Sequence, residues 1–133
     1  MPLIAKGSFT VKLAPLALDD KAADASLGRL SIDKQFQGDL EGVSKGEMLS
    51  AGTAVKGSAG YVAIERVTGM LNGKTGSFVL QHSATMSRGA PELRITVVPD
   101  SGTGALEGLS GQMAIHLSVR DHFYEFTYSL NGE

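Results

Sequence analysis

Two runs of alternating hydrophobic and polar residues flank Asn72-Gly73 and predict a β-hairpin. The runs cover residues 60–68 and 76–84. Asn-Gly favours the positive φ angles of a two-residue hairpin turn. With these two residues in the turn, Leu71 lies opposite Lys74 and Glu65 lies opposite Leu80. The pattern therefore predicts the register of the hairpin as well as its existence.

This register sorts the side chains of the hairpin onto two faces. We expect one face to point inwards because it holds most of the aromatic rings, whereas the other carries Arg66, Gln81 and Ser83. Glu65 and His82 share the inward face as diagonal neighbours, within side-chain reach of each other. The inward face carries Tyr61, Ala63, Glu65, Val67, Phe78, Leu80 and His82, and the outward face carries Val62, Ile64, Arg66, Thr68, Ser77, Val79, Gln81 and Ser83.

Six further runs predict strands in the rest of the chain. They cover residues 7–13, 28–36, 92–98, 113–120 and 123–130, with one more strand within residues 39–50. A two-residue turn at Asp121-His122 would place Arg120 opposite Phe123 and leave His116 on the wet face. The register of the second and third strands is left open. This turn aligns Met113, Ile115, Leu117 and Val119 with Leu130, Tyr128, Phe126 and Tyr124 on one apolar face.

Eight antiparallel strands with short links suit a sandwich or a barrel. The chain contains 17 glycines, spread between the apolar runs. Gly42, Gly46 and Gly60 lie within predicted strands and favour the corners of a barrel, where bending needs a residue without Cβ. Residues 16–26 fit one or two helical turns, or an irregular connection that could act as a lid. We therefore predict an all-β fold, a single eight-stranded antiparallel barrel over residues 1–133, with little or no helix.

Composition narrows the function classes. The net charge is −2, which argues against nucleic-acid and anionic-membrane partners. The chain has no cysteine, no apolar run of membrane-spanning length and no signal-peptide pattern, so we expect a cytoplasmic protein. His82, His116 and His122 are predicted to lie apart, so neither a metal site nor another cofactor is expected.

Several motifs resemble known barrel families. Residues 101–112 are similar to a glycine-patterned segment of allene oxide cyclases and plant dirigent proteins. Residues 34–42, 76–83, 98–104 and 124–128 resemble, over almost the whole chain, the bacterial domain-of-unknown-function family numbered 3224. The resemblance implies an allene oxide cyclase-like, calycin-type barrel. Related barrels assemble, so it also implies a homodimer or homotrimer.

The inward carboxylate is the main candidate for chemistry, because an unpaired buried charge is costly. Glu65 and His82 are candidate catalytic residues; alternatively, Glu65 pairs with a lysine or arginine and His82 is a satisfied inner histidine. Three functions stay open: binding of a small hydrophobic ligand inside the barrel, a cofactor-free isomerase or cyclase, and an oligomeric interaction module with a solid core. The candidate ligand-binding residues are Tyr61, Phe78, Leu80, Tyr124, Phe126 and Tyr128.

Overall fold

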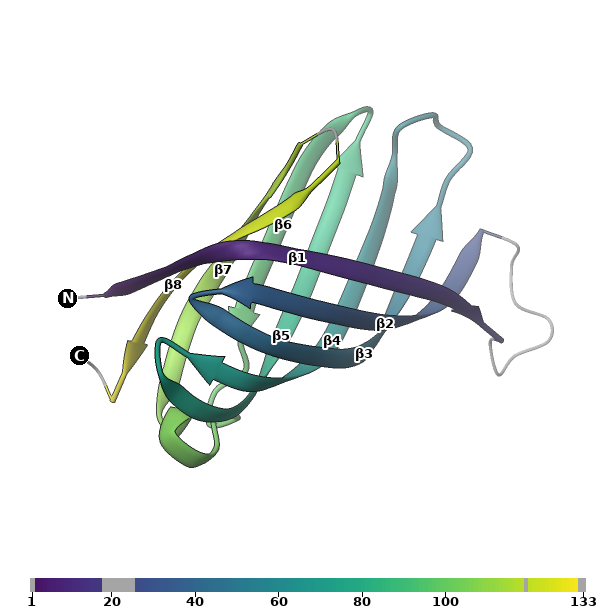
Figure 1. Ribbon diagram of the computed structural model, residues 1–133. Coiled ribbons are helices and arrows are strands. Elements are labelled where there is room, and N and C mark those ends of the chain that lie inside the picture. Colours follow the sequence, from purple (N-terminus) through teal and green to yellow (C-terminus); the bar gives the residue numbers. More distant parts are fainter. Residues whose placement is uncertain (1, 18–25, 119, 132–133) are drawn as a thin grey trace.

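The chain folds into a closed antiparallel β-barrel whose strands follow sequence order, which confirms the predicted fold class (Figure 1). The computed structural model describes residues 2–17, 26–118 and 120–131. A single turn of 3₁₀ helix, η1 (Gly104–Leu106), is the only helix in these ranges. The strands are β1 (Leu3–Leu16), β2 (Leu27–Gly38), β3 (Leu40–Gly52), β4 (Ala59–Leu71), β5 (Lys74–Ser87), β6 (Ala90–Val97), β7 (Leu109–Leu117) and β8 (His122–Leu130).

The connections alternate between the two ends of the barrel, which we call the closed end and the mouth. The closed end carries the β2–β3 and β4–β5 turns and the β6–β7 connection with η1. The mouth carries the β3–β4 and β5–β6 loops, which project together at the top of Figure 1. β1 also ends and β2 begins at this end of the barrel, since Leu16 pairs with Arg29, but residues 18–25 between them lie outside the described residues. The predicted helical turns or lid in this segment are therefore not tested.

The β4–β5 hairpin has the register that the sequence predicts. Leu71 pairs with Lys74 and Ala63 pairs with His82. Asn72 has a φ of 47° and Gly73 a φ of 86°, as a turn with two positive φ angles requires. The predicted inward face is buried apart from the partly exposed Tyr61, while the outward Val62 and Ile64 are about half exposed. Patterning therefore assigned both the register and the two faces correctly.

The predicted register of the last hairpin is wrong. Met113 pairs with Phe126 and Leu117 pairs with His122, a shift of four residues from the prediction. The backbone N–H of Ser118 donates to the carbonyl oxygen of Asp121 at 2.9 Å, so the connection lies before His122, which begins β8. A shift by an even number of residues keeps every side chain on its face, so hydrophobic patterning alone could not detect it.

The predicted corner glycines differ in what they do. A Cβ on Gly46 would lie 1.9 Å from the carbonyl oxygen of Ile64, so β3 and β4 approach more closely there than any side chain permits. Gly42 approaches Thr68 in the same way, at 2.4 Å. A Cβ on Gly60 would meet its nearest atom at 3.4 Å, an ordinary contact. Close packing therefore requires glycine at positions 42 and 46 but not at position 60.

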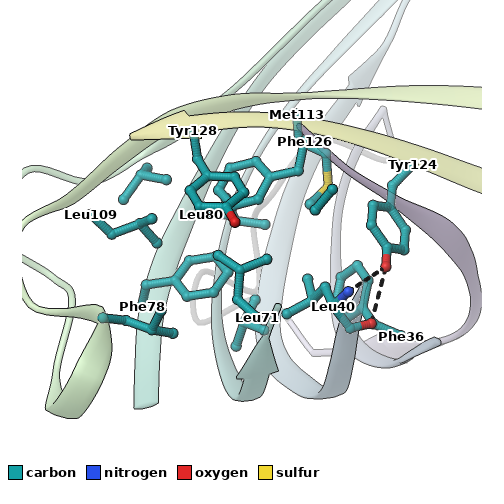
Figure 2. Packing of buried hydrophobic residues seen from close by; sticks show 14 of the residues in the cluster. Phe36, Leu40, Leu71, Phe78, Leu80, Leu109, Met113, Tyr124, Phe126 and Tyr128 are labelled. Carbon is teal, nitrogen blue, oxygen red and sulfur yellow. Dashed lines mark hydrogen bonds between the residues drawn. The ribbon is translucent and has the colours of Figure 1, made fainter. Parts of the chain in front are cut away.

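The half of the barrel towards the closed end is packed solid (Figure 2). The rings of Phe78 and Phe126 stack with centroids 5.7 Å apart, and Tyr128 stacks on Phe126 at 5.3 Å. The Tyr124 hydroxyl accepts the backbone N–H of Leu40 at 2.8 Å and lies 3.0 Å from the Leu40 carbonyl oxygen. Open space for a ligand must therefore lie elsewhere.

The barrel has one weak seam, between β6 and β7. These strands share a single paired position, Thr96 with Gln112, whereas β4 and β5 pair along their whole length. A groove of about 640 Å³ runs along the outside of the seam, between residues such as Arg94, Ala114 and Thr127. The barrel is thus closed, but few backbone pairings join β6 to β7.

Candidate functional site

Four polar side chains are buried together inside the barrel, and we call them the polar cluster. They are Lys34 on β2, Ser44 on β3, Glu65 on β4 and His82 on β5, and their exposed fractions are 8%, 1%, 0% and 4%. Four consecutive strands thus contribute one inward-facing residue each. Such burial is unusual for charged groups and requires each to find a partner.

Glu65 is the centre of the polar cluster. Its Oε2 atom lies 2.8 Å from Lys34 Nζ and 2.6 Å from His82 Nε2, and its Oε1 atom accepts the Ser44 hydroxyl at 2.7 Å. The carboxylate therefore accepts three hydrogen bonds. One interpretation of the sequence was that Glu65 pairs with a lysine or an arginine. In the structure that partner is Lys34.

Strand register brings these residues together. Lys34 pairs directly with Ser44, and Glu65 pairs with Gly46 two residues further along β3. The Lys34–Glu65 ion pair therefore crosses the inner face of β3 at two small residues. His82 pairs with Ala63, which leaves the imidazole free to lean diagonally towards Glu65.

The surroundings keep Glu65 ionised. Burial alone would raise its pKa, but the hydrogen bond with His82 and the positive charge of Lys34 together lower the pKa from 4.5 to about 2. An ionised carboxylate can only accept hydrogen bonds, so the His82 Nε2 atom must carry the hydrogen between them. A neutral His82 therefore carries its lone pair on Nδ1.

The ammonium group of Lys34 also lies against two aromatic rings. Its Nζ atom is 5.1 Å from the centroid of Phe9 and 5.9 Å from that of Phe36. Cation–π attraction at these distances adds to the ion pair in stabilising the buried charge. Lys34 is thus held in place from three sides.

A cavity of about 220 Å³ lies between the polar cluster and the mouth. Lys34, His82, Tyr61 and His122 are the lining residues with polar side chains, while Glu65 lies behind Lys34 and His82 and does not line the cavity. The remaining wall is apolar and includes Phe9, Val11, Ile32, Met48, Ala63 and Leu117. The polar cluster therefore presents a lysine and a histidine to the cavity and keeps its carboxylate covered.

A second, larger hollow adjoins this cavity at the mouth. It measures about 570 Å³ and shares Met48, Tyr61, Leu93 and Leu117 with the first. Leu93 and Leu117 face inwards along their strands and are nevertheless 43% and 71% exposed. The cavity therefore has an apolar path to solvent through the mouth.

The structure separates the predicted site residues into two groups. Tyr61 and His82 line the cavity, and Glu65 contacts His82 from behind. The other five predicted ligand-binding residues lie in the packed core, away from the cavity wall: Phe78, Leu80, Tyr124, Phe126 and Tyr128. The sequence predicts them as ligand-binding residues because large inward-facing side chains are expected to line an open interior.

Sequence reasoning missed Lys34 and Ser44. Lys34 alternates with Ile32 and Phe36 along β2, so its inward direction was visible once the strand was recognised. A lysine between two large apolar residues on one face is a signal for a buried ion pair. Ser44 carried no such signal, because the register of β2 and β3 was open.

Two further site types have no support in the part of the chain that the structure describes. No three histidine, aspartate or glutamate side chains gather there as a metal ion would need. The single helical turn in those ranges, η1, is far too short to cross a membrane.

The comparisons with known proteins agree with the fold. The family model described as "Protein of unknown function (DUF3224)" matches residues 5–128. A crystal structure of a DUF3224 protein of unknown function from Shewanella oneidensis MR-1 is 51% identical, covers 98% of each chain and superposes with a TM-score of 0.92. No curated protein matches the sequence.

Proposed function

Since the chain belongs to the DUF3224 family of proteins of unknown function, we propose from the geometry of its site that the barrel binds a small apolar or amphipathic molecule. The observation that carries this proposal is the cavity between the polar cluster and the mouth. Ligand sites are typically apolar hollows with a few convergent polar groups, and the mouths of β-barrels commonly hold them.

The size of the cavity limits the ligand. An apolar cavity of about 150 Å³ suffices to bind benzene, whereas drug-sized ligands occupy about 300–1,000 Å³. The 220 Å³ here fits a single ring or a short aliphatic chain. A longer ligand would extend into the hollow at the mouth, along Leu93 and Leu117.

A neutral probe tests this proposal. We expect 1-octanol, followed by ¹H–¹⁵N NMR, to shift the amide signals of cavity residues such as Ala63 and Leu117. Ala63→Leu would fill the cavity and weaken this binding, whereas Val62→Leu, on the outer face of the same strand, would not. Should Ala63→Leu fail to fold, Leu117→Glu at the exposed rim would serve instead. Shifts confined to the outer face would contradict the proposal.

A second candidate function is supported by the Glu65–His82 pair. A carboxylate that orients an imidazole towards a cavity is the arrangement of a general base. Here His82 Nδ1 would take a proton from the carbon next to a carbonyl group. The electron pair of that C–H bond would form the carbon–carbon double bond of an enolate, while the carbonyl π pair moves to oxygen, where Lys34 would stabilise the negative charge. Return of the proton to the opposite face of that carbon, or to another carbon conjugated with the enolate, would give the isomer. This sequence is a cofactor-free isomerisation, with Glu65 as the positioning residue.

Deuterium exchange tests the second candidate. We expect the protons next to the carbonyl group of 2-octanone to exchange in D₂O faster with the wild-type protein than with His82→Gln. His116→Gln, which alters an exposed histidine on β7, is the control and should match the wild type. Equal exchange in all three proteins would exclude this chemistry for His82.

Three expectations from the sequence remain predictions. They are the resemblance of residues 101–112 to allene oxide cyclases, the cytoplasmic location and the assembly into a homodimer or homotrimer.

A further inference from the structure

The polar side chains that line the cavity include basic residues but no acidic residue of the described chain. Three nitrogen-bearing side chains line it, those of Lys34, His82 and His122, and no aspartate or glutamate of residues 2–17, 26–118 and 120–131 does. The nearest carboxylate, that of Glu65, is completely buried behind Lys34 and His82. A negatively charged group that enters the cavity therefore meets the ammonium group of Lys34 and no acidic side chain from the described part of the chain.

Lys34 retains donor capacity towards the cavity. Its ammonium group has three N–H donors, and among the described residues one of them reaches Glu65. The aromatic rings of Phe9 and Phe36 border the same group, but they do not replace a hydrogen-bond acceptor. A ligand oxygen could therefore accept from Lys34 without displacing Glu65.

His82 is similarly placed. Its Nε2 atom is engaged by Glu65, which leaves Nδ1 as the ring nitrogen without a partner in the described part of the chain. The imidazole lines the cavity. Lys34 Nζ and His82 Nε2 both contact the same oxygen, Glu65 Oε2, so the two side chains lie close enough to serve one head group.

We propose that the bound molecule carries a carboxylate head group, held between Lys34 Nζ and His82 Nδ1, with its apolar body directed towards the mouth. This inference rests on the proposed binding function and names the ligand class. The apolar wall suits a short aliphatic or single-ring body, and the basic groups at its inner end suit one negative charge.

The balance of charges in the cavity involves His82 as well as Lys34. The charges of Lys34 and Glu65 cancel, so a carboxylate would bring an uncompensated negative charge into a largely apolar site. An imidazolium form of His82, with hydrogens on both ring nitrogens, would present an Nδ1–H donor to the head group and supply the balancing charge. The other titratable groups on the cavity wall are Tyr61 and His122.

Three ligands with the same eight-carbon chain test the head group. We expect octanoate to bind at least about tenfold more tightly than 1-octanol in calorimetry at pH 7, and octylamine to bind most weakly. Equal affinity for octanoate and 1-octanol would overturn the anionic head group while leaving the binding function intact. Absence of binding by all three would overturn both.

A double variant locates the head group. Lys34→Met/Glu65→Gln removes both charges of the pair and so avoids leaving a buried charge alone. We expect its preference for octanoate over 1-octanol to disappear, so that the two ligands bind with about equal affinity. Lys45→Met, which removes an exposed lysine of β3, should leave both affinities unchanged. Wild-type octanoate affinity in the double variant would overturn the assignment to Lys34.

Discussion

The ammonium group of Lys34 lies 2.8 Å from the carboxylate of Glu65, and both side chains are almost fully withdrawn from water. An ion pair of this kind adds little to stability over a well-packed apolar pair, yet loss of one partner is severe because it leaves the other charge buried. We therefore relate the buried pair to the proposed ligand site, where Lys34 lines the cavity and Glu65 balances its charge from behind.

Removal of Lys34 alone should destabilise the protein strongly. We expect Lys34→Met to lower the free energy of unfolding by about 3–5 kcal/mol in urea titrations, because Glu65 loses its counter-charge. Adding Glu65→Gln should restore part of that loss. Lys45→Met breaks an exposed 3.5 Å pair with Asp33 and should cost less than about 1 kcal/mol. A Lys34→Met protein as stable as Lys45→Met would show that the buried pair contributes nothing.

Acid should weaken the fold through Glu65. Its pKa is lowered in the folded state, from 4.5 to about 2, so the folded state binds fewer protons than the unfolded state between these values. The resulting stabilisation, roughly 3 kcal/mol, is complete above pH 4.5 and is lost as the pH falls through 2. Urea titrations at several pH values should show this slope in the wild type and a shallower one in Lys34→Met/Glu65→Gln. Parallel curves would argue against it.

Two glycine-to-alanine substitutions test whether glycine is sterically required at positions 46 and 60. Gly46→Ala would force a Cβ to within 1.9 Å of the Ile64 carbonyl oxygen, so β3 and β4 must separate beside the polar cluster. We expect a loss of several kcal/mol, or no folded protein. Gly60→Ala meets only an ordinary 3.4 Å contact and should be close to neutral in thermal unfolding. Similar melting temperatures for the two variants would contradict the close approach at Gly46.

The Tyr124 hydroxyl should contribute to stability and not to ligand binding. Tyr124→Phe leaves the backbone N–H of Leu40 without its 2.8 Å acceptor in the packed half of the barrel. We expect a loss of about 1–3 kcal/mol in the free energy of unfolding. Octanoate affinity should not change, because Tyr124 lies outside the cavity wall. A lower affinity without loss of stability would place the ligand deeper than we propose.

The two hairpins show what residue patterns can predict. The β4–β5 register followed from Asn72-Gly73, because this dipeptide fixes both the turn type and its position. The β7–β8 connection has no such dipeptide, and an apolar face looks the same after a shift of four residues, so the wrong register satisfied the same pattern.

The candidate site was predictable only in part. The proximity of Glu65 and His82 depended on one correctly predicted hairpin. The contribution of Lys34 depends on pairings across β2, β3 and β4, and the sequence left the first of these open. The boundary between cavity and packed core was not predictable at all, because alternation shows which side chains point inwards and not how completely they fill the space.

The seam between β6 and β7 bears on how the barrel opens. Thr96 and Gln112 form the one paired position there. The β6–β7 connection that contains η1 is bound to β5 instead, since the backbone N–H of Thr103 donates to the carbonyl oxygen of Ser77 at 2.8 Å. Parting the strands above that point disturbs few backbone hydrogen bonds. We therefore expect local opening of the barrel wall to occur mainly between β6 and β7. Such opening would give the interior a second route to solvent, through the side of the barrel as well as through the mouth.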